Sequence, residues 1–451
     1  MTIVNLGEID IARKIRRTAF LKEANQKVLA RVGTGRTLDM KEMERLVEVA
    51  VEQAFKSITV PDDVELTVEE ARRQTRNNIL GYGPLDDLLA NGTYSDIMVN
   101  RFDEIYVEHE GKILVTDKSF LDEAHLRNII DRVLRALGKS VNDLNPYVDG
   151  RLPDGSRINV VIPPVALDGP MLTIRMFPQI PLTVNDLIEK YDSFTHGFAR
   201  FLKIIVRNRK NIVIAGGSGS GKTTLLNVIS EYIPKEERIV TIEDSAELKL
   251  SQPHVGRMEA RQANYEGKGE VSIRDLVRNA LRMRPDRIVV GECRGGEAID
   301  MLQAMNTGHD GSITTIHANS PLDVLWRLET MVTMAGFDIP LQAIRRQVSS
   351  AIDIIIQVAR LADGQRKVVR VSEVLGLHDD EIQIQDLFEF RKEYVAEGGE
   401  IQGILKSVDN FPSFMDHVVP EERDILQEIF LGNDLHSEQE KVESSASGET
   451  P

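Results

Sequence analysis

Residues 212–224 read IVIAGGSGSGKTT, an apolar run that passes into a glycine-rich segment and ends in lysine and threonine. The part at 216–223, GGSGSGKT, matches the phosphate-binding pattern G-x-x-x-x-G-K-[S/T]. The apolar run predicts a buried strand, and the residues after the lysine predict a helix. A phosphate-binding loop needs this context, because its backbone N–H groups and the N-terminus of the next helix together attract an anion.

The loop predicts that the chain binds a nucleoside triphosphate together with Mg²⁺. Lys222 is expected to reach the β- and γ-phosphates, and Thr223 is expected to bind Mg²⁺. The nearest match to a guanine-reading Asn-Lys-x-Asp motif, NRKN at 208–211, lacks the final aspartate, which favours ATP over GTP. The predicted nucleotide-binding residues are Gly217, Ser218, Gly219, Ser220, Gly221, Lys222, Thr223 and Thr224.

Two glutamates follow apolar runs that come after the loop. Glu243 follows the run at 239–242, and Glu292 follows the run at 287–291. In a parallel sheet the carboxyl ends of strands meet at the edge where ligands bind. ATP hydrolysis needs one carboxylate for the attacking water and another for the metal. Either glutamate alone fits a structural cap nearly as well, but their joint placement favours catalysis, and the two compete for the two roles.

Helix and strand patterns alternate from about residue 192, which predicts an α/β fold with a parallel sheet covered by helices. Short apolar runs before residue 177 predict a smaller mixed domain, and helical spacing before residue 60 predicts a helical module. The expected segments are a helical N-terminal module at 1–60, a mixed α/β domain at 61–177, a linker at 178–190, a P-loop ATPase domain at 191–405, and a C-terminal extension with an acidic disordered tail at 406–451.

The bulk composition argues against several classes of protein. A formal net charge of −16 repels a phosphate backbone over most of the surface, so we expect no direct nucleic-acid binding. The single cysteine, Cys293, excludes an intrachain disulfide and a multi-cysteine zinc site. The sequence has no apolar run of about 18 residues and begins without a basic and apolar leader. We therefore expect a cytoplasmic protein.

Four motifs occur in a fixed order along the chain. They are the P-loop at 216–224, an aspartate box TIEDSAEL at 241–248, a Walker B segment RPDRIVVGE at 284–292, and a histidine box GHDGSITTIHAN at 308–319. Together they resemble the type II/type IV secretion ATPases, and within them the tight-adherence (Flp-type) pilus assembly ATPases. The resemblance runs from about residue 70 to about residue 377.

The resemblance implies a RecA-like P-loop motor domain, preceded by the smaller mixed α/β domain and the helical module. It assigns Glu243 as the base that activates water and Glu292 as the Walker B acid near Mg²⁺, with Thr223 as the second metal ligand. It also implies that His309 and His317 link the nucleotide state to contacts between subunits. Each histidine alone is more often a hydrogen-bonded structural residue.

Two arginines match the arginine-bearing region of this family. Arg157 ends the segment GRLPDGSR at 150–157, and Arg175 ends a predicted strand. The resemblance implies that both reach the γ-phosphate when the domains close, as arginine fingers do. The alternative is that both form ordinary surface ion pairs.

The resemblance further implies a homo-hexamer that powers pilus assembly or secretion through an inner-membrane platform protein. Such a motor associates with the cytoplasmic face of the inner membrane through its partners. Two features of the sequence depart from many members of the family. The single cysteine excludes the Cys-x-x-Cys zinc insertion of many type II motors. Ser245 stands where many relatives have proline, which is compatible with the tight-adherence branch. Two alternatives stay open, a conjugation or DNA-export ATPase of the same superfamily and a scaffold that binds ATP without hydrolysing it.

Overall fold

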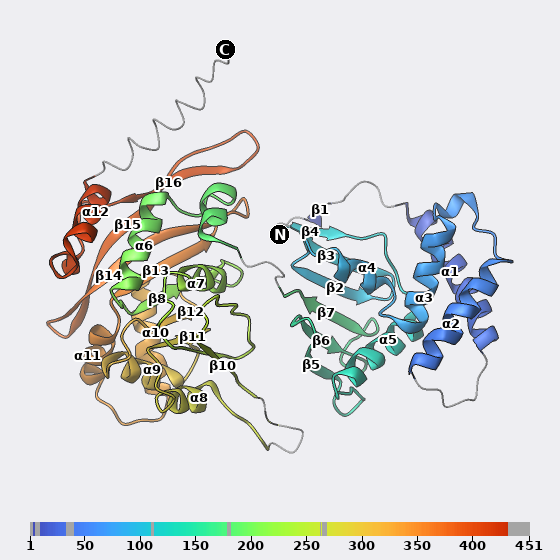
Figure 1. The fold of residues 1–451 in the computed structure, drawn as a ribbon, viewed down its shortest axis with the longest axis horizontal. Helices are drawn as coiled ribbons and strands as arrows, with labels where there is room; N and C mark the ends of the chain where they lie inside the picture. Colours follow the sequence, from blue (N-terminus) through green and yellow to red (C-terminus); the bar gives the residue numbers. More distant parts are fainter. Residues whose placement is uncertain are drawn as a thin grey trace, which may run out of the picture. The chain divides into compact units, whose positions relative to one another are not determined.

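The chain forms two compact units, Met1–Gln179 and Ile180–Pro451 (Figure 1). The structure is a computed structural model, and it describes residues 3–4, 10–32, 40–109, 112–177, 182–261, 263 and 268–431. Part of the predicted linker, 178–181, lies outside the described residues, as do residues 432–451, which include the predicted acidic tail at 437–451. In the part of the chain that is described, no helix has both the length and the apolar character of a membrane span.

Three helices at the start of the first unit share one small core, in which Val28, Val47 and Ala71 are buried. They are α1 (Ile11–Val32), α2 (Met40–Phe55) and α3 (Val68–Leu80). The capping box predicted for α3 is confirmed, because the Glu70 N–H donates to the Thr67 hydroxyl (3.2 Å) and the Thr67 N–H donates to the Glu70 carboxylate (2.8 Å). Helices α1 and α2 of the predicted helical module therefore pack against α3.

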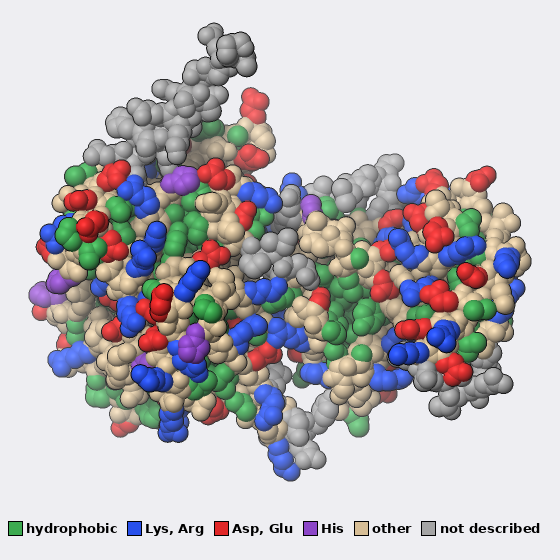
Figure 2. Space-filling model, in the orientation of Figure 1, with side chains coloured by type: hydrophobic (Ala, Val, Ile, Leu, Met, Phe, Trp, Pro, Cys, Tyr) green, Lys and Arg blue, Asp and Glu red, His purple; other side chains and the backbone are tan. Residues whose placement is uncertain are grey.

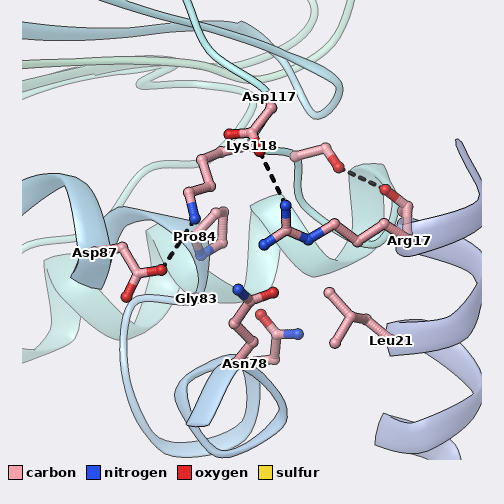
Figure 3. A pocket seen from close by; sticks show the side chains of 11 residues that line it. Arg17, Leu21, Asn78, Gly83, Pro84, Asp87, Asp117 and Lys118 are labelled. Carbon is pink, nitrogen blue, oxygen red and sulfur yellow. Dashed lines mark hydrogen bonds and ion pairs between the residues drawn. The ribbon is translucent and has the colours of Figure 1, made fainter. Parts of the chain in front are cut away.

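A polar pocket lies between α1, α3, α4 (Pro84–Ala90) and the segment at residues 117–119 (Figure 3). Arg17 on α1 donates to Asp117 at 2.9 Å, and Lys118 donates to Asp87 at 3.1 Å. The charged groups that line the pocket therefore pair with one another. We assign the pocket a structural role, because the bond from Arg17 to Asp117 holds α1 against the residues that follow the strands.

A seven-stranded sheet forms the rest of the first unit, in the order β1-β4-β3-β2-β7-β6-β5. All neighbours are antiparallel except β1 and β4. Helix α5 (Glu123–Ala136) buries its apolar face against the sheet, and the short helix η1 (Asp62–Val64) precedes α3. The strands are β1 (Ile3–Val4), β2 (Asp96–Arg101), β3 (Glu104–His109), β4 (Lys112–Val115), β5 (Tyr147–Arg151), β6 (Arg157–Val161) and β7 (Met171–Arg175).

The second unit contains a nine-stranded sheet in the order β10-β9-β11-β12-β8-β13-β14-β15-β16. The six strands from β10 to β13 are parallel, and β14 to β16 continue the sheet antiparallel. This confirms the predicted α/β fold, with a parallel sheet covered by helices and an antiparallel extension. The strands are β8 (Ile212–Ala215), β9 (Ile239–Glu243), β10 (Val255–Glu259), β11 (Arg287–Val290), β12 (Ile313–Ile316), β13 (Ile354–Arg360), β14 (Arg366–His378), β15 (Glu381–Val395) and β16 (Ile401–Ser407).

Helices cover both faces of this sheet. Successive residues of one strand point to opposite faces and therefore belong to two different hydrophobic cores. Val289 belongs to one core, whereas Ile288 and Val290 belong to the other. The first core is closed by η2 (Asp186–Lys190), α6 (His196–Arg207), α7 (Lys222–Ser230), η3 (Ser413–His417) and α12 (Pro420–Phe430). The second is closed by α8 (Ile273–Ala280), α9 (Glu297–Asn306), α10 (Pro321–Met334) and α11 (Leu341–Ala351).

Helix α12 lies beyond residue 405 and yet belongs to the same core as the P-loop strand. Leu426 is fully buried there, and Glu428 pairs with Arg200 on α6 at 2.5 Å. The folded core of the second unit therefore extends past the boundary expected for the ATPase domain.

Candidate active site

The phosphate-binding loop joins β8 to α7 at the carboxyl edge of the parallel strands. Gly219 and Gly221 have φ values of +70° and +96°, a region that glycine adopts without steric cost. Gly216 lies so close to β13 that a Cβ there would collide with the carbonyl oxygen of Val358. The backbone thus requires the glycines of the motif at these three positions.

Two side chains of the loop converge on the carbonyl oxygen of Gly217. Lys222 Nζ and Ser220 Oγ each lie 2.9 Å from it. Burial lowers the pKa of Lys222, and the nearby carboxylate of Glu292 opposes that shift. Because a phosphate oxygen is charged, it is a stronger acceptor than a carbonyl for the same donors. Lys222 and Ser220 therefore fit the phosphates of a nucleotide.

The residues of the site also fit Mg²⁺. Thr223 is the second residue of α7 and Thr224 the third, so both stand at the helix N-terminus that follows the loop. Among the described residues no group of three or more His, Cys, Asp or Glu could hold a metal ion. Mg²⁺ needs no such cage, since it binds through one or two protein oxygens together with substrate phosphates. The hydroxyl of Thr223 and the carboxylate of Glu292 are oxygen donors of that kind.

Glu292 follows β11 and lies within a cluster of charged side chains. Its Oε1 is 2.9 Å from His317 Nε2, at the distance of an ion pair but without the alignment of a hydrogen bond. Its Oε2 accepts a hydrogen bond from Arg294 Nη2 at 2.5 Å. His317 Nε2 is in turn 3.4 Å from Lys222 Nζ. The cluster therefore connects the Walker B acid to the phosphate-binding lysine through one imidazole.

The protonation state of His317 follows from these neighbours. Burial lowers its pKa, and the ammonium of Lys222 lowers it further, while Glu292 acts in the opposite direction. Since the ordinary pKa of histidine is about 6.5, the imidazole is neutral at pH 7. A neutral Nε2 can donate to Glu292 or accept from Lys222, so it can exchange one partner for the other.

Glu243 ends β9, the strand next to β11, and its side chain is buried. Its Oε2 accepts hydrogen bonds from the backbone N–H groups of Glu247 (2.6 Å) and Leu248 (2.9 Å). Its Oε1 is also buried and has no hydrogen-bond partner among the described residues. Burial raises the pKa of this carboxyl, and the two backbone bonds lower it in part. One oxygen thus holds the aspartate-box turn, and the other is left without a partner among the described residues.

The glycine loop, the two strand-end glutamates and the histidine-box imidazole agree with one known family. A family model described as "Type II/IV secretion system protein" matches residues 78–391. The chain belongs to this family. It is therefore a type II/IV secretion ATPase.

The chain is also similar to named relatives and to a solved structure. The chain is 32% identical over 301 residues to the conjugal transfer protein TrbB of Rhizobium radiobacter, covering 66% of this chain and 88% of the relative. It is 32% identical over 323 residues to the type IV secretion system protein VirB11 of Bartonella quintana, covering 64% and 90%. A crystal structure of the pilus retraction motor PilT with bound ADP is similar at 20% identity and a TM-score of 0.48, covering 78% of this chain and 88% of that one.

The structure separates the two histidines of the histidine box. His317 follows the carboxyl end of β12 and joins the cluster with Glu292, whereas His309 precedes the amino end of the same strand. The backbone N–H of His309 donates to Ala304 (3.3 Å), and its carbonyl accepts from Ser312 Oγ (2.7 Å). His309 therefore does not contact the nucleotide cluster, and its predicted role between subunits stays a prediction.

The two predicted arginine fingers lie side by side in the first unit of the ATPase. Arg157 opens β6 and Arg175 closes β7, and the two are paired in the register of these strands. Arg175 forms an ion pair with Asp96 at 3.1 Å, and 64% of its side chain is exposed. Both belong to a different unit from the phosphate-binding loop, so their role at the γ-phosphate stays a prediction.

Sequence reasoning missed two arginines of the second unit. Arg294 follows Glu292 by two residues and pairs with it, so its proximity to the Walker B acid was a usable signal. Arg366 donates from Nε to the carbonyl of Gly219 at 2.9 Å. These two residues are 147 positions apart, and no local pattern in the sequence indicates that contact.

The raised pKa of Glu243 predicts a pH-dependent stability. Because the folded carboxyl keeps its proton to higher pH than the unfolded one, the wild type loses stability as pH rises through the ordinary carboxyl range up to the folded pKa. Glu243→Gln lacks this loss. We expect urea unfolding to show that the free energy of unfolding of the variant, minus that of wild type, increases with pH across that range. Above the range we expect this difference to be constant. A relative stability that decreases with rising pH would contradict the assignment.

Proposed function

We propose that this ATPase is a hexameric motor at the cytoplasmic face of the inner membrane, where it powers pilus assembly or secretion through a platform complex. The tight-adherence branch remains our preferred placement. The observation that carries the motor role is the cluster of Lys222, His317 and Glu292, which three different parallel strands bring to one edge of the sheet. A scaffold that only binds ATP needs the loop but has no use for the strand-end acids.

A conjugation or DNA-export role is the second candidate, and the relatives named for conjugal transfer and type IV secretion support it. The charge of the chain opposes direct contact with DNA, since the net charge is −16. On the face that Figure 2 shows, acidic and basic side chains are interspersed over the described surface. The two candidates therefore differ chiefly in the membrane protein that the motor acts on.

Cross-linking in the native cell, followed by purification of the chain, tests this choice. We expect an inner-membrane platform protein of a pilus or secretion system among the cross-linked partners. Its amount is expected to change in the Lys222→Ala variant, because a motor engages its platform according to its nucleotide state. Recovery of a DNA-transfer coupling protein in place of a platform protein would favour the second candidate.

Domain closure onto the nucleotide predicts a large effect of the two arginines of the first unit. We expect Arg157→Ala and Arg175→Ala each to leave ADP binding intact and to lower turnover at least about a hundredfold, which is about 2.7 kcal/mol in the barrier. The matched control is Arg101→Ala, which removes a surface ion pair with Asp103 (3.2 Å) in the same unit. A double variant with turnover within about threefold of wild type, in an assembled oligomer, would exclude the arginine-finger role.

A further inference from the structure

Arg366 reaches the phosphate-binding loop from outside the four motifs. Its Nε donates to the carbonyl oxygen of Gly219 at 2.9 Å. A Cβ added at Gly221 would lie 3.4 Å from Arg366 Cδ, so the aliphatic part of the arginine lies against the loop at that glycine. One side chain thus contacts the loop at both positive-φ glycines.

The fold of the antiparallel extension places Arg366 there. β13 runs parallel to β8, from Ile354 opposite Ile212, so both strands end at the edge that carries the loop. The chain turns back at that edge and enters β14 with Arg366 as its first residue. Asp363 fixes the turn, because its carboxylate accepts hydrogen bonds from the backbone N–H of Gln365 (3.0 Å) and of Ile401 on β16 (2.6 Å).

The contact acts on the peptide that joins Gly219 to Ser220. A cation bonded to a carbonyl oxygen forms a charge-assisted hydrogen bond and polarises the peptide, which makes the N–H on its other side a stronger donor. That N–H belongs to Ser220, which donates a long hydrogen bond to the carbonyl of Gly217 (N to O 3.4 Å), the oxygen on which Lys222 also converges. Among the described residues, the two terminal nitrogens of Arg366 have no hydrogen-bond or ion-pair partner that would draw the guanidinium away.

We propose that Arg366 is a positioning residue for the phosphates of the nucleotide. It holds the Gly219 carbonyl outward, polarises the peptide, and so strengthens the Ser220 N–H as a phosphate donor. Both ADP and ATP present a diphosphate to this N–H, so both nucleotides gain affinity. The proposal rests on nucleotide binding at the loop and not on the motor role.

The test compares full-length Arg366→Ala, Arg366→Lys and wild type. We expect Arg366→Ala to weaken binding of ADP and of a non-hydrolysable ATP analogue by about tenfold each, which is about 1.4 kcal/mol. The KM for ATP rises by the same factor and kcat stays within about threefold, since the contact serves ground state and transition state alike. Arg366→Lys recovers part of the affinity, because its ammonium keeps the charge and one donor.

Two further measurements make the test specific. Inorganic pyrophosphate, which competes with labelled ADP, is expected to lose affinity in Arg366→Ala as ADP does, because the contact concerns phosphates. Arg391→Ala, an exposed arginine of β15 in the same extension, serves as the control and is expected to bind ADP like wild type. Thermal unfolding of each nucleotide-free variant reports whether the fold is intact.

Three results would overturn the proposal. They are unchanged ADP affinity in Arg366→Ala, a pyrophosphate affinity that stays at the wild-type value while that of ADP falls, and a hundredfold loss of kcat with normal ADP binding. The second would place Arg366 at the base or ribose, and the third at the reacting phosphate. A wild-type chain that binds ADP but does not hydrolyse ATP would contradict the proposed motor function. The ADP affinities of Arg366→Ala and wild type could still be compared.

Discussion

Replacing Lys222 with alanine is expected to lower ATP turnover by at least about a thousandfold, about 4 kcal/mol in the barrier. Lys222 is buried, its Nζ bonds to the Gly217 carbonyl at 2.9 Å, and it lies 3.4 Å from His317. The variant loses the cation that neutralises charge on the β- and γ-phosphates as the bond to the γ-phosphoryl group breaks. It also disconnects the loop from Glu292.

The control for this variant is Lys203→Ala. Lys203 is an exposed residue of α6 in the same unit, so its loss removes one positive charge without touching the loop. We expect normal turnover and normal nucleotide affinity in the control, measured by phosphate release and by titration with a fluorescent ADP. Unchanged affinity and turnover in Lys222→Ala would remove the assignment of residues 216–223 as the phosphate site.

Glu243→Gln is expected to bind ATP as wild type does and to lower turnover by about a thousandfold, within the range for general bases. The amide keeps the shape of the side chain, and its oxygen can still accept from the N–H groups of Glu247 and Leu248. What it removes is a carboxylate of raised pKa whose Oε1 has no partner among the described residues. A raised pKa brings a carboxylate closer to the value at which a general base works best.

Glu292→Gln is the matched comparison for the base assignment. Its carboxylate is tied to Arg294 at 2.5 Å and faces His317, which suits a residue that holds Mg²⁺ more than one that takes a proton from water. We expect this variant to need more Mg²⁺ for half-maximal turnover, whereas Glu243→Gln keeps the wild-type Mg²⁺ dependence. Near-normal turnover in Glu243→Gln would transfer the role of base to Glu292.

Local patterns in the sequence were sufficient to predict most of the architecture. The loop and its flanking strand and helix, both strand-end glutamates and the capping box at Thr67 depend on neighbours within a few residues, and the structure confirms their placement. The buried parallel strands could also be predicted from the sequence, because a strand that is covered on both faces is an unbroken apolar run.

What the sequence did not show depends on contacts between distant segments. The bond from Arg366 to Gly219 arises only because β13 pairs with β8 and the chain then turns back. The sequence places His309 and His317 on either side of β12, but the contact of His317 with Glu292 depends on the pairing of β12 with β11. The packing of α12 against α6 in one core could not be predicted, because the pattern of an amphipathic helix does not indicate which surface the helix covers.

Hydrolysis of bound ATP under single-turnover conditions tests the central claim, that the loop and the two glutamates form a hydrolytic site. The full-length protein, in excess over labelled ATP, is mixed with Mg²⁺ and quenched at intervals, and a parallel sample contains a chelator. We predict that bound ATP is converted to ADP and phosphate with Mg²⁺, and that it remains intact with the chelator. Recovery of intact ATP from the Mg²⁺ sample, with the protein assembled and the nucleotide bound, would contradict the account and leave a nucleotide-binding scaffold.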